Sequence, residues 1–185
     1  MLFRSMAIWG GLVSGGLAAL FAARRDGIPT RQLADAAVVG LLLGQMVGRL
    51  GCIVNGDAFG GPTSLPWGFV YLHPDAFIPD ALRGVLTHPY PLYEILWDGA
   101  LLGAILLLRR RITKEGMLFC VYVAVYGAGR FALTFVRQEA IILWGLQQAQ
   151  LVAVTASVLA LAGMVYLAKA PVLPPKARKL RAATR

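Results

Sequence analysis

Two arginines inside otherwise apolar segments are the residues of this chain best suited to chemistry. Arg49 ends an uncharged run that begins after Asp35, and Arg130 lies within the apolar run from 116 to 136. An arginine at the centre of a membrane helix costs about 2.5–3.5 kcal/mol on insertion scales unless it finds a partner. Its planar guanidinium group binds phosphate or carboxylate through paired hydrogen bonds. We therefore expect Arg49 and Arg130 to mark a site for an anionic group.

Further charged residues surround these arginines in the sequence pattern. Arg137 follows Arg130 by seven residues, which places it two helical turns away on a similar face. Glu94, Asp98 and Asp57 are available as internal counter-ions, so a purely structural ion network is an alternative interpretation. Snorkelling of arginines toward the membrane surface is a second alternative, and it suits Arg137 best.

The composition is that of a polytopic membrane protein. The chain has 185 residues, is 58% hydrophobic and has a mean hydropathy of +0.66. Its net charge is +9, but 13 of the 18 Lys and Arg lie in the three short patches 24–31, 109–114 and 169–185. Such patches between apolar runs are typical of cytoplasmic loops and argue against nucleic-acid binding. The two cysteines lie in separate apolar segments, and no metal-ligand spacing is present.

Five apolar segments predict an all-α integral membrane fold with one transmembrane domain, residues 1–168, and a basic cytoplasmic tail, residues 169–185. The expected spans cover residues 5–23, 35–50, 91–108, 116–136 and 147–168. Alternating the sides of the membrane puts the basic patches in the cytoplasm and the amino terminus outside. A signal peptide is the alternative interpretation of the first segment.

Residues 51–90 interrupt this pattern with many prolines, glycines and aromatic residues. Prolines at this density exclude a regular span, whereas aromatic rings are enriched at the depth of the lipid headgroups. We expect an interfacial or re-entrant arm on the outer side, between the second and third helices. Before it, Gly40, Gly44 and Gly48 leave one helix face without side chains, which favours close approach of a helix or a lipid.

The run of residues 48–60 supplies a more specific signal. It reads Gly-Arg-Leu-Gly-Cys-Ile-Val-Asn-Gly-Asp-Ala-Phe-Gly. This resembles the signature of the bacterial prolipoprotein diacylglyceryl transferase family, Gly-Arg-x-Gly-Asn-Phe-x-Asn-Gly-Glu-x-x-Gly. Further matches occur in the order in which the family carries them. They are Asp35, His88-Pro89, Leu92-Tyr93-Glu94, Asp98-Gly99, Tyr126-Gly127, Arg130, Arg137 and Gln150.

The resemblance implies a reaction at the outer face of the bacterial cytoplasmic membrane. The family transfers the diacylglyceryl group of phosphatidylglycerol to the lipobox cysteine thiol of a preprolipoprotein signal peptide, without a cofactor or metal. The catalytic residues implied are Arg49, Arg130 and His88. Those implied to bind phosphatidylglycerol are Arg49, Asn55, Asp57, Gly60, Glu94, Tyr126, Arg130 and Arg137. Those implied to support the site are Asp35, Tyr93, Asp98 and Gln150.

The sequence departs from the family pattern at several positions. Trp9 stands where the family carries the histidine of a His-Gly-Gly-Leu motif, Cys52 replaces an asparagine, and Thr134 replaces an acid. The chain also begins late relative to the family, so we expect an N-terminally shortened, divergent member. Loss of the histidine leaves His88 and His73 as candidate bases. A member that binds phospholipid or signal peptide without transfer is therefore an alternative, as is a small transporter, although the chain lacks the inverted repeat typical of transporters.

Overall fold

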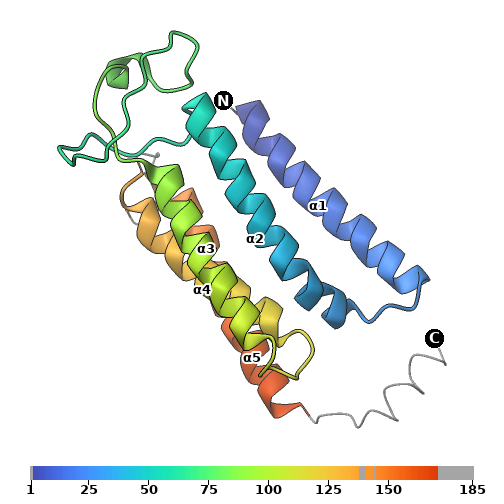
Figure 1. Ribbon diagram of the computed structural model, residues 1–185. Helices are drawn as coiled ribbons and strands as arrows, with labels where there is room; N and C mark the ends of the chain where they lie inside the picture. The colour runs from blue at the N-terminus through green and yellow to red at the C-terminus, as the bar shows by residue number, and fades with distance from the viewer. Residues whose placement is uncertain (1, 138–140, 144, 171–185) are drawn as a thin grey trace.

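The computed structural model describes residues 2–137, 141–143 and 145–170, with the side chains of residues 2–9, 12 and 141–143 left aside. Five α-helices run side by side in alternating directions (Figure 1). They are α1 (Leu2–Arg25), α2 (Thr30–Asn55), α3 (Tyr90–Leu108), α4 (Met117–Thr134) and α5 (Gln148–Lys169). The prediction of an all-helical protein with five helices is confirmed.

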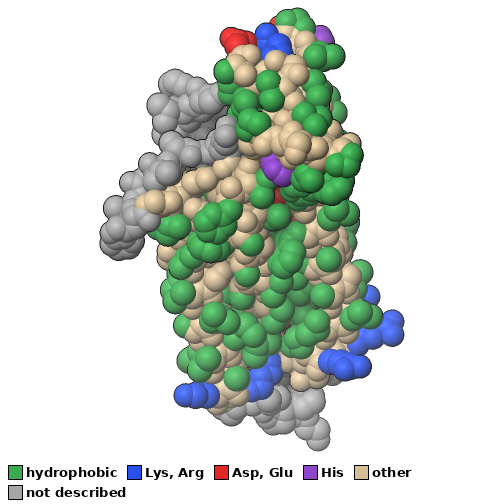
Figure 2. Space-filling view, turned by 90° about the vertical axis from the view of Figure 1, so that its left-hand side faces the viewer, with side chains coloured by type: hydrophobic (Ala, Val, Ile, Leu, Met, Phe, Trp, Pro, Cys, Tyr) green, Lys and Arg blue, Asp and Glu red, His purple; other side chains and the backbone are tan. Residues whose placement is uncertain are grey.

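Helices α2, α3, α4 and α5 are long and apolar enough to cross a membrane. Helix α1, whose first side chains lie outside those described, is not among the four that meet this criterion within the described residues. Figure 2 shows apolar side chains over the middle of the bundle and most of the visible Lys and Arg at one end. The chain therefore has the architecture of a multi-pass membrane protein.

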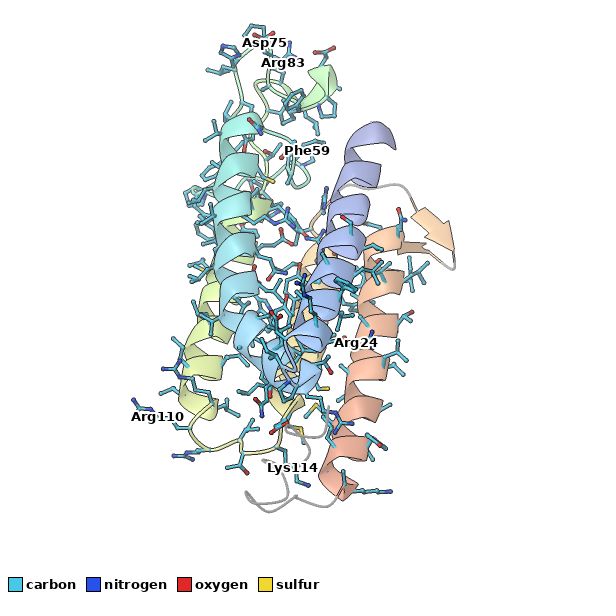
Figure 3. The ribbon with its side chains drawn as sticks, turned by 90° about the vertical axis from the view of Figure 1, so that its right-hand side faces the viewer. Arg24, Phe59, Asp75, Arg83, Arg110 and Lys114 are labelled. Carbon is cyan, nitrogen blue, oxygen red and sulfur yellow. The ribbon has the colours of Figure 1, made fainter. Side chains whose placement is uncertain are left out.

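The two ends of the bundle differ in composition, and we name them accordingly. The basic end carries Arg24, Arg110 and Lys114, as labelled in Figure 3. The arm end carries residues 56–89, the segment between α2 and α3, with a 3-10 turn at Asp80–Leu82. Between α4 and α5, the short antiparallel strands β1 (Ile141–Leu143) and β2 (Leu146–Gln147) form a hairpin that the sequence analysis did not predict.

Small residues bring α4 close to both of its neighbours. Gly127 faces Ser157 and the carbonyl of Ala153 on α5, and a Cβ at Gly127 would stand 3.0 Å from that carbonyl oxygen. Gly129 faces the Trp97 indole of α3 so closely that it leaves no room for a Cβ. Glycine at a helix interface permits such close approach of backbones in membranes. Helix α4 is therefore held tightly on two sides.

Polar contacts at the basic end fix the relative positions of the helices. The carboxylate of Asp35 on α2 accepts hydrogen bonds from the backbone N–H groups of Gly116 (2.6 Å) and Phe119 (2.9 Å). It thus caps the start of α4, where four N–H groups lack partners within the helix. Lys114 donates to the Leu167 carbonyl at 3.0 Å and also to that of Ala168, at the end of α5.

The arm is attached to the bundle by backbone hydrogen bonds. Gly60 N–H donates to the His88 carbonyl (3.1 Å), His88 N–H donates to the Gly61 carbonyl (2.9 Å), and Gly61 N–H donates to the Val136 carbonyl (2.9 Å). A Cβ at Gly60 would stand 2.6 Å from the Cβ of His88. Only glycine therefore fits where the arm passes between the start of α3 and the end of α4.

Candidate anion-binding site

Three helices contribute charged side chains to one cluster near the arm end. Arg49 of α2 forms an ion pair with Oε2 of Glu94 on α3, and Arg130 of α4 forms an ion pair with Oε1 of the same carboxylate. Glu94 is 4% exposed, whereas the two arginine side chains are 20% and 18% exposed. We name these residues the arginine–carboxylate cluster.

Tyr90 completes the cluster, and the sequence analysis missed it. This residue is fully buried, donates a hydrogen bond to Glu94 Oε1 (2.9 Å) and accepts one from Arg130 Nη1 (2.9 Å). The guanidinium carbons of Arg130 and Arg137 lie 5.8 and 5.4 Å from the centre of its ring, which is cation–π distance. The sequence did contain a signal for Tyr90, because this residue precedes Glu94 by four positions and so shares its helix face.

Arg49 also contacts the last turn of its own helix. Its Nη1 donates to Cys52 Sγ at 3.8 Å, so the cysteine at the family's asparagine position takes part in the surroundings of the arginine. Helix α2 ends two residues before Asp57, because Gly56 adopts a left-handed conformation with φ 70°. Asp57 Oδ1 is buried and has no hydrogen-bond partner among the described residues.

The Tyr71 ring covers this end of α2. A Cβ at Gly56 would stand 3.1 Å from the ring. Burial raises the pKa of the Tyr71 phenol, and the negative charge of neighbouring Asp57 adds to the effect. The phenol therefore stays protonated at neutral pH. Asn55 is exposed here and, with Tyr71 and Phe77, lines a small pocket of the arm.

His88 and Tyr93 join the arm to the start of α3. Tyr93 Oη accepts a hydrogen bond from Trp67 Nε1 (3.0 Å) and lies 3.3 Å from His88 Nδ1. The Tyr93 oxygen keeps a second acceptor position beside the one that Trp67 occupies, so His88 Nδ1–H can donate to it. In this tautomer Nε2 carries no proton and can act as an acceptor. His88 is partly exposed, and the contact with Tyr93 orients its ring.

Two further predicted site residues, Arg137 and Gln150, lie at the turn between α4 and α5. Gln147 Nε2 donates to the carbonyls of Thr134 (3.3 Å) and Arg137 (3.0 Å). Gln150 is buried and accepts from Gln147 N–H at 3.0 Å, which forms a reciprocal cap at the start of α5. Thr134, at the position of the family's acid, is buried and donates to the Arg130 carbonyl. It bonds to its own helix and contributes no charge.

A second polar layer lies one helical turn below the cluster, toward the basic end. Asp98 follows Glu94 by four residues on α3 and is 2% exposed. Tyr126 lies on α4 one turn from Arg130, and its ring stacks on Tyr122 with centroids 5.7 Å apart. Tyr126 interacts electrostatically with Arg49, and its predicted role of holding an arginine in place stays a prediction.

Two predicted positions lie elsewhere. Asp35 caps α4 at the basic end, fourteen residues before Arg49 and therefore about 21 Å away along α2. Trp9 belongs to α1, and its side chain lies outside those described. Within the described part of the chain, no group of three or more His, Cys, Asp or Glu side chains is placed to hold a metal ion.

The cluster is suited to binding an anion. Two guanidinium groups share one carboxylate, so the three side chains carry an excess positive charge. Arginine forks match the oxygens of a phosphate and bind it more strongly where water is scarce. Nearby aromatic rings and apolar helix faces provide the surroundings of a lipid rather than those of a soluble metabolite.

Comparison with known proteins agrees with this picture. The family model for prolipoprotein diacylglyceryl transferase matches residues 4–166. A phosphatidylglycerol–prolipoprotein diacylglyceryl transferase from Nostoc is 38% identical over 168 residues, which cover 88% of this chain and 59% of that protein. The protein of the same name from Clostridioides difficile is 34% identical over 89% of this chain and 62% of its own length.

A third relative of that name, from Mycobacterium bovis, is 34% identical over 97% of this chain and 40% of its own length. The chain thus spans about three fifths of the length of the Nostoc and Clostridioides relatives.

Proposed function

Because the chain belongs to the prolipoprotein diacylglyceryl transferase family, we propose that it transfers the diacylglyceryl group of phosphatidylglycerol to the lipobox cysteine thiol of a preprolipoprotein. The observation that carries this proposal is the pair of arginines on one buried carboxylate. In the proposed complex, Arg49 and Arg130 bind the lipid phosphate. Glu94 positions both guanidinium groups, and Tyr90 contacts Glu94 and Arg130.

The proposed reaction exchanges a carbon–oxygen bond for a carbon–sulfur bond. The thiolate attacks the glyceryl carbon, the bond from that carbon to the phosphate oxygen breaks, and glycerol phosphate leaves with one additional negative charge. Arg49 and Arg130 stabilise this charge, as preorganised donors do in sites that exclude water. A thiol has an ordinary pKa near 8.5, so it needs a base or a positive field at neutral pH. His88, oriented by Tyr93 at the arm end, is the proposed base.

The reaction has a proposed place in the bacterial cytoplasmic membrane. Positively charged loops remain on the cytoplasmic side, so we assign the basic end to the cytoplasm and the arm end, with the cluster, to the outer face. The arm then lies at the depth of the phosphatidylglycerol headgroup, where Asn55, Asp57 and Gly60 are proposed to contact the headgroup.

One observation favours a second candidate function, the binding of phospholipid without transfer. Cys52 Sγ takes a hydrogen bond from Arg49 where the family carries an asparagine. Thr134 bonds to its own helix where the family carries an acid. A site altered in this way would retain the arginines that bind phosphate.

A transfer assay separates the two functions. Purified chain in detergent is mixed with phosphatidylglycerol and a lipobox peptide, and thioether-linked peptide is measured by mass spectrometry. Arg49→Lys and Arg130→Lys keep the charge but lose the paired N–H donors of the guanidinium group. We expect each to reduce product at least about 100-fold, because removing one donor to a developing anion costs about that much. Arg110→Ala, at the basic end, is the matched control and keeps wild-type turnover.

Absence of product from the wild-type chain, together with phosphatidylglycerol binding that needs both arginines, would favour the second function. Product that is unaffected by the arginine substitutions would rule out the proposed role of the cluster in either function.

A further inference from the structure

The second polar layer contains a buried acid that the proposed reaction does not use. Asp98 follows Glu94 by four residues on α3, and Gln45 precedes Arg49 by four residues on α2. Both side chains therefore lie one turn below the arginine–carboxylate cluster, on the same helix faces. Helix α4 contributes Tyr122 to the same depth, and its Oη accepts a hydrogen bond from Gln45 Nε2 at 3.0 Å.

Two acceptor atoms in this layer lack a donor. Asp98 is 2% exposed and its Oδ1 has no hydrogen-bond partner among the described residues. Gln45 Oε1 is likewise buried without a partner in the described part of the chain. An acceptor without a donor in an apolar interior costs free energy, and more so when it is ionised. A proton on Asp98 would remove the charge and supply a donor.

The charge of Glu94, the other buried carboxylate, is compensated by two ion pairs, although its Oε2 has no hydrogen bond among the described residues. Both oxygens of Glu94 contact arginines, and Tyr90 donates a further hydrogen bond. Asp98 interacts electrostatically with Arg49 of α2 and with Tyr122 and Tyr126 of α4. Glu94 lies four residues away on the same helix. Asp57 Oδ1 also lacks a partner among the described residues, but Asp57 is only partly buried, so Asp98 is the carboxylate for which an uncompensated charge is most costly.

The charges of the two layers balance before a lipid binds. Arg49 and Arg130 face Glu94 and Asp98, while Arg137 over the Tyr90 ring is balanced by Asp57 at the end of α2. The net charge is therefore zero when all three acids are ionised, although the arginine–carboxylate cluster alone is positive. A phosphodiester then adds one negative charge to a region of low dielectric, where an uncompensated charge is costly. Uptake of one proton restores the balance without breaking an ion pair, provided that the proton goes to the carboxylate that lacks a hydrogen bond.

We propose that Asp98 takes up a proton when the phosphate of an anionic phospholipid binds the arginine–carboxylate cluster, and releases it when the phosphate leaves. This inference rests on the proposed function, because it places a lipid phosphate on Arg49 and Arg130. Binding that takes up a proton is stronger at low pH. Lipid affinity therefore falls as the pH rises, over the pH range in which Asp98 is ionised in the lipid-free protein. For one coupled proton, the fall is at most about tenfold per pH unit.

Calorimetry can count this proton directly. The purified chain in detergent is titrated with short-chain phosphatidylglycerol, whose phosphodiester does not itself titrate near neutral pH, in two buffers of different ionisation enthalpy. The difference in heat gives the protons bound per lipid. The titration is repeated from about pH 5 to about pH 9, the range between ordinary carboxylate and phenol titration. We expect the number of protons taken up per lipid to reach a maximum near one for the wild type and to stay near zero for Asp98→Asn.

Matched variants test whether the proton belongs to Asp98. Asn resembles the protonated acid, so Asp98→Asn should bind phosphatidylglycerol with an affinity that no longer depends on pH. Asp80→Asn removes an exposed carboxylate of the arm and should keep the wild-type proton count. Asp98→Glu, which restores a titrating group, should recover the uptake.

Lipid binding without proton uptake in the wild type would overturn the inference whatever the variants do, as would full uptake in a folded Asp98→Asn protein. The transfer assay separates this result from failure of the proposed function. Thioether product with no proton uptake refutes the inference alone, and proton uptake with no product refutes transfer alone. Absence of phosphatidylglycerol binding at every pH refutes both.

Discussion

Arg49 of α2 and Arg130 of α4 contact different oxygens of one carboxylate. The two arginines are 81 residues apart in the chain, so the shared acid, Glu94, is what brings them together. Each guanidinium group also keeps some exposure to its surroundings. An incoming phosphate can therefore bind both arginines without first separating two independent salt bridges.

Replacement of Glu94 by Gln should destabilise the protein and make its stability depend on lipid. The change removes the charge that compensates two partly buried arginines, and loss of one partner of a buried ion pair costs about 3–5 kcal/mol. We expect a lower thermal unfolding midpoint in detergent. Phosphatidylglycerol should raise that midpoint more in the variant than in the wild type, because its phosphate replaces the lost charge.

The control for this experiment is Asp75→Asn, since the Asp75 side chain in the arm is 90% exposed. It should unfold as the wild type does, with and without lipid. An unchanged midpoint for Glu94→Gln would show that the arginines do not depend on this carboxylate.

Replacement of Tyr90 by Phe should weaken the cluster while leaving its ring contacts intact. The variant loses the hydroxyl that donates to Glu94 and accepts from Arg130. Hydrogen bonds to charged groups contribute about 1.5–3 kcal/mol, so we expect a loss of that order in thermal stability and weaker binding of phosphatidylglycerol. Tyr166→Phe, on an exposed ring of α5, is the matched control, and equal behaviour of the two variants would contradict the role of the Tyr90 hydroxyl.

Replacement of Gly60 by Ala should loosen the arm. The added Cβ would meet the Cβ of His88 at 2.6 Å and the carbonyl oxygen of Val136 at 3.2 Å. Overpacking of this kind costs about 1–3 kcal/mol. Limited proteolysis should cut residues 61–89 faster in this variant than in Gly40→Ala, where the added methyl group meets open space. Equal cleavage rates would show that the arm is held by other contacts.

Replacement of Asp35 by Ala should lower stability without changing the chemistry. The variant leaves the N–H groups of Gly116 and Phe119 without their acceptor, and loss of a helix cap costs about 0.5–2 kcal/mol. Because Asp35 lies at the opposite end of α2 from Arg49, turnover per folded molecule should match the wild type. Asp35→Asn keeps one acceptor oxygen and should recover part of the stability. A turnover defect in folded Asp35→Ala protein would contradict a purely capping role.

The sequence was sufficient to identify the fold class and the three charged residues of the cluster, but not Tyr90. Long apolar runs interrupted by charged patches define membrane helices, because the bilayer admits few other structures. The short motifs around Arg49, Glu94 and Arg130 predicted a shared site although these residues lie on three helices. Neighbours on a single helix, such as Tyr90 and Glu94, were also within reach of sequence reasoning through their spacing of four.

Contacts between helices were not predictable in the same way. Asp35, predicted as a supporting residue of the site, caps α4 at the basic end, and its role in activity stays a prediction. Its position depends on how α2 and α4 pack, and helical periodicity does not contain that information. The hairpin of β1 and β2 was not predicted for a different reason. Strands of two or three residues are too short to show an alternating pattern.

The glycines of the two arginine-bearing helices differ in their surroundings. Gly127 and Gly129 hold α4 against α5 and α3, whereas Gly44 and Gly48 of α2 face open space. The face of α2 just below Arg49 is thus smooth and uncovered by the described residues. We expect an acyl chain of the bound lipid to lie along this bare strip of helix, so larger residues at positions 44 and 48 should discriminate between lipids by the bulk of their chains.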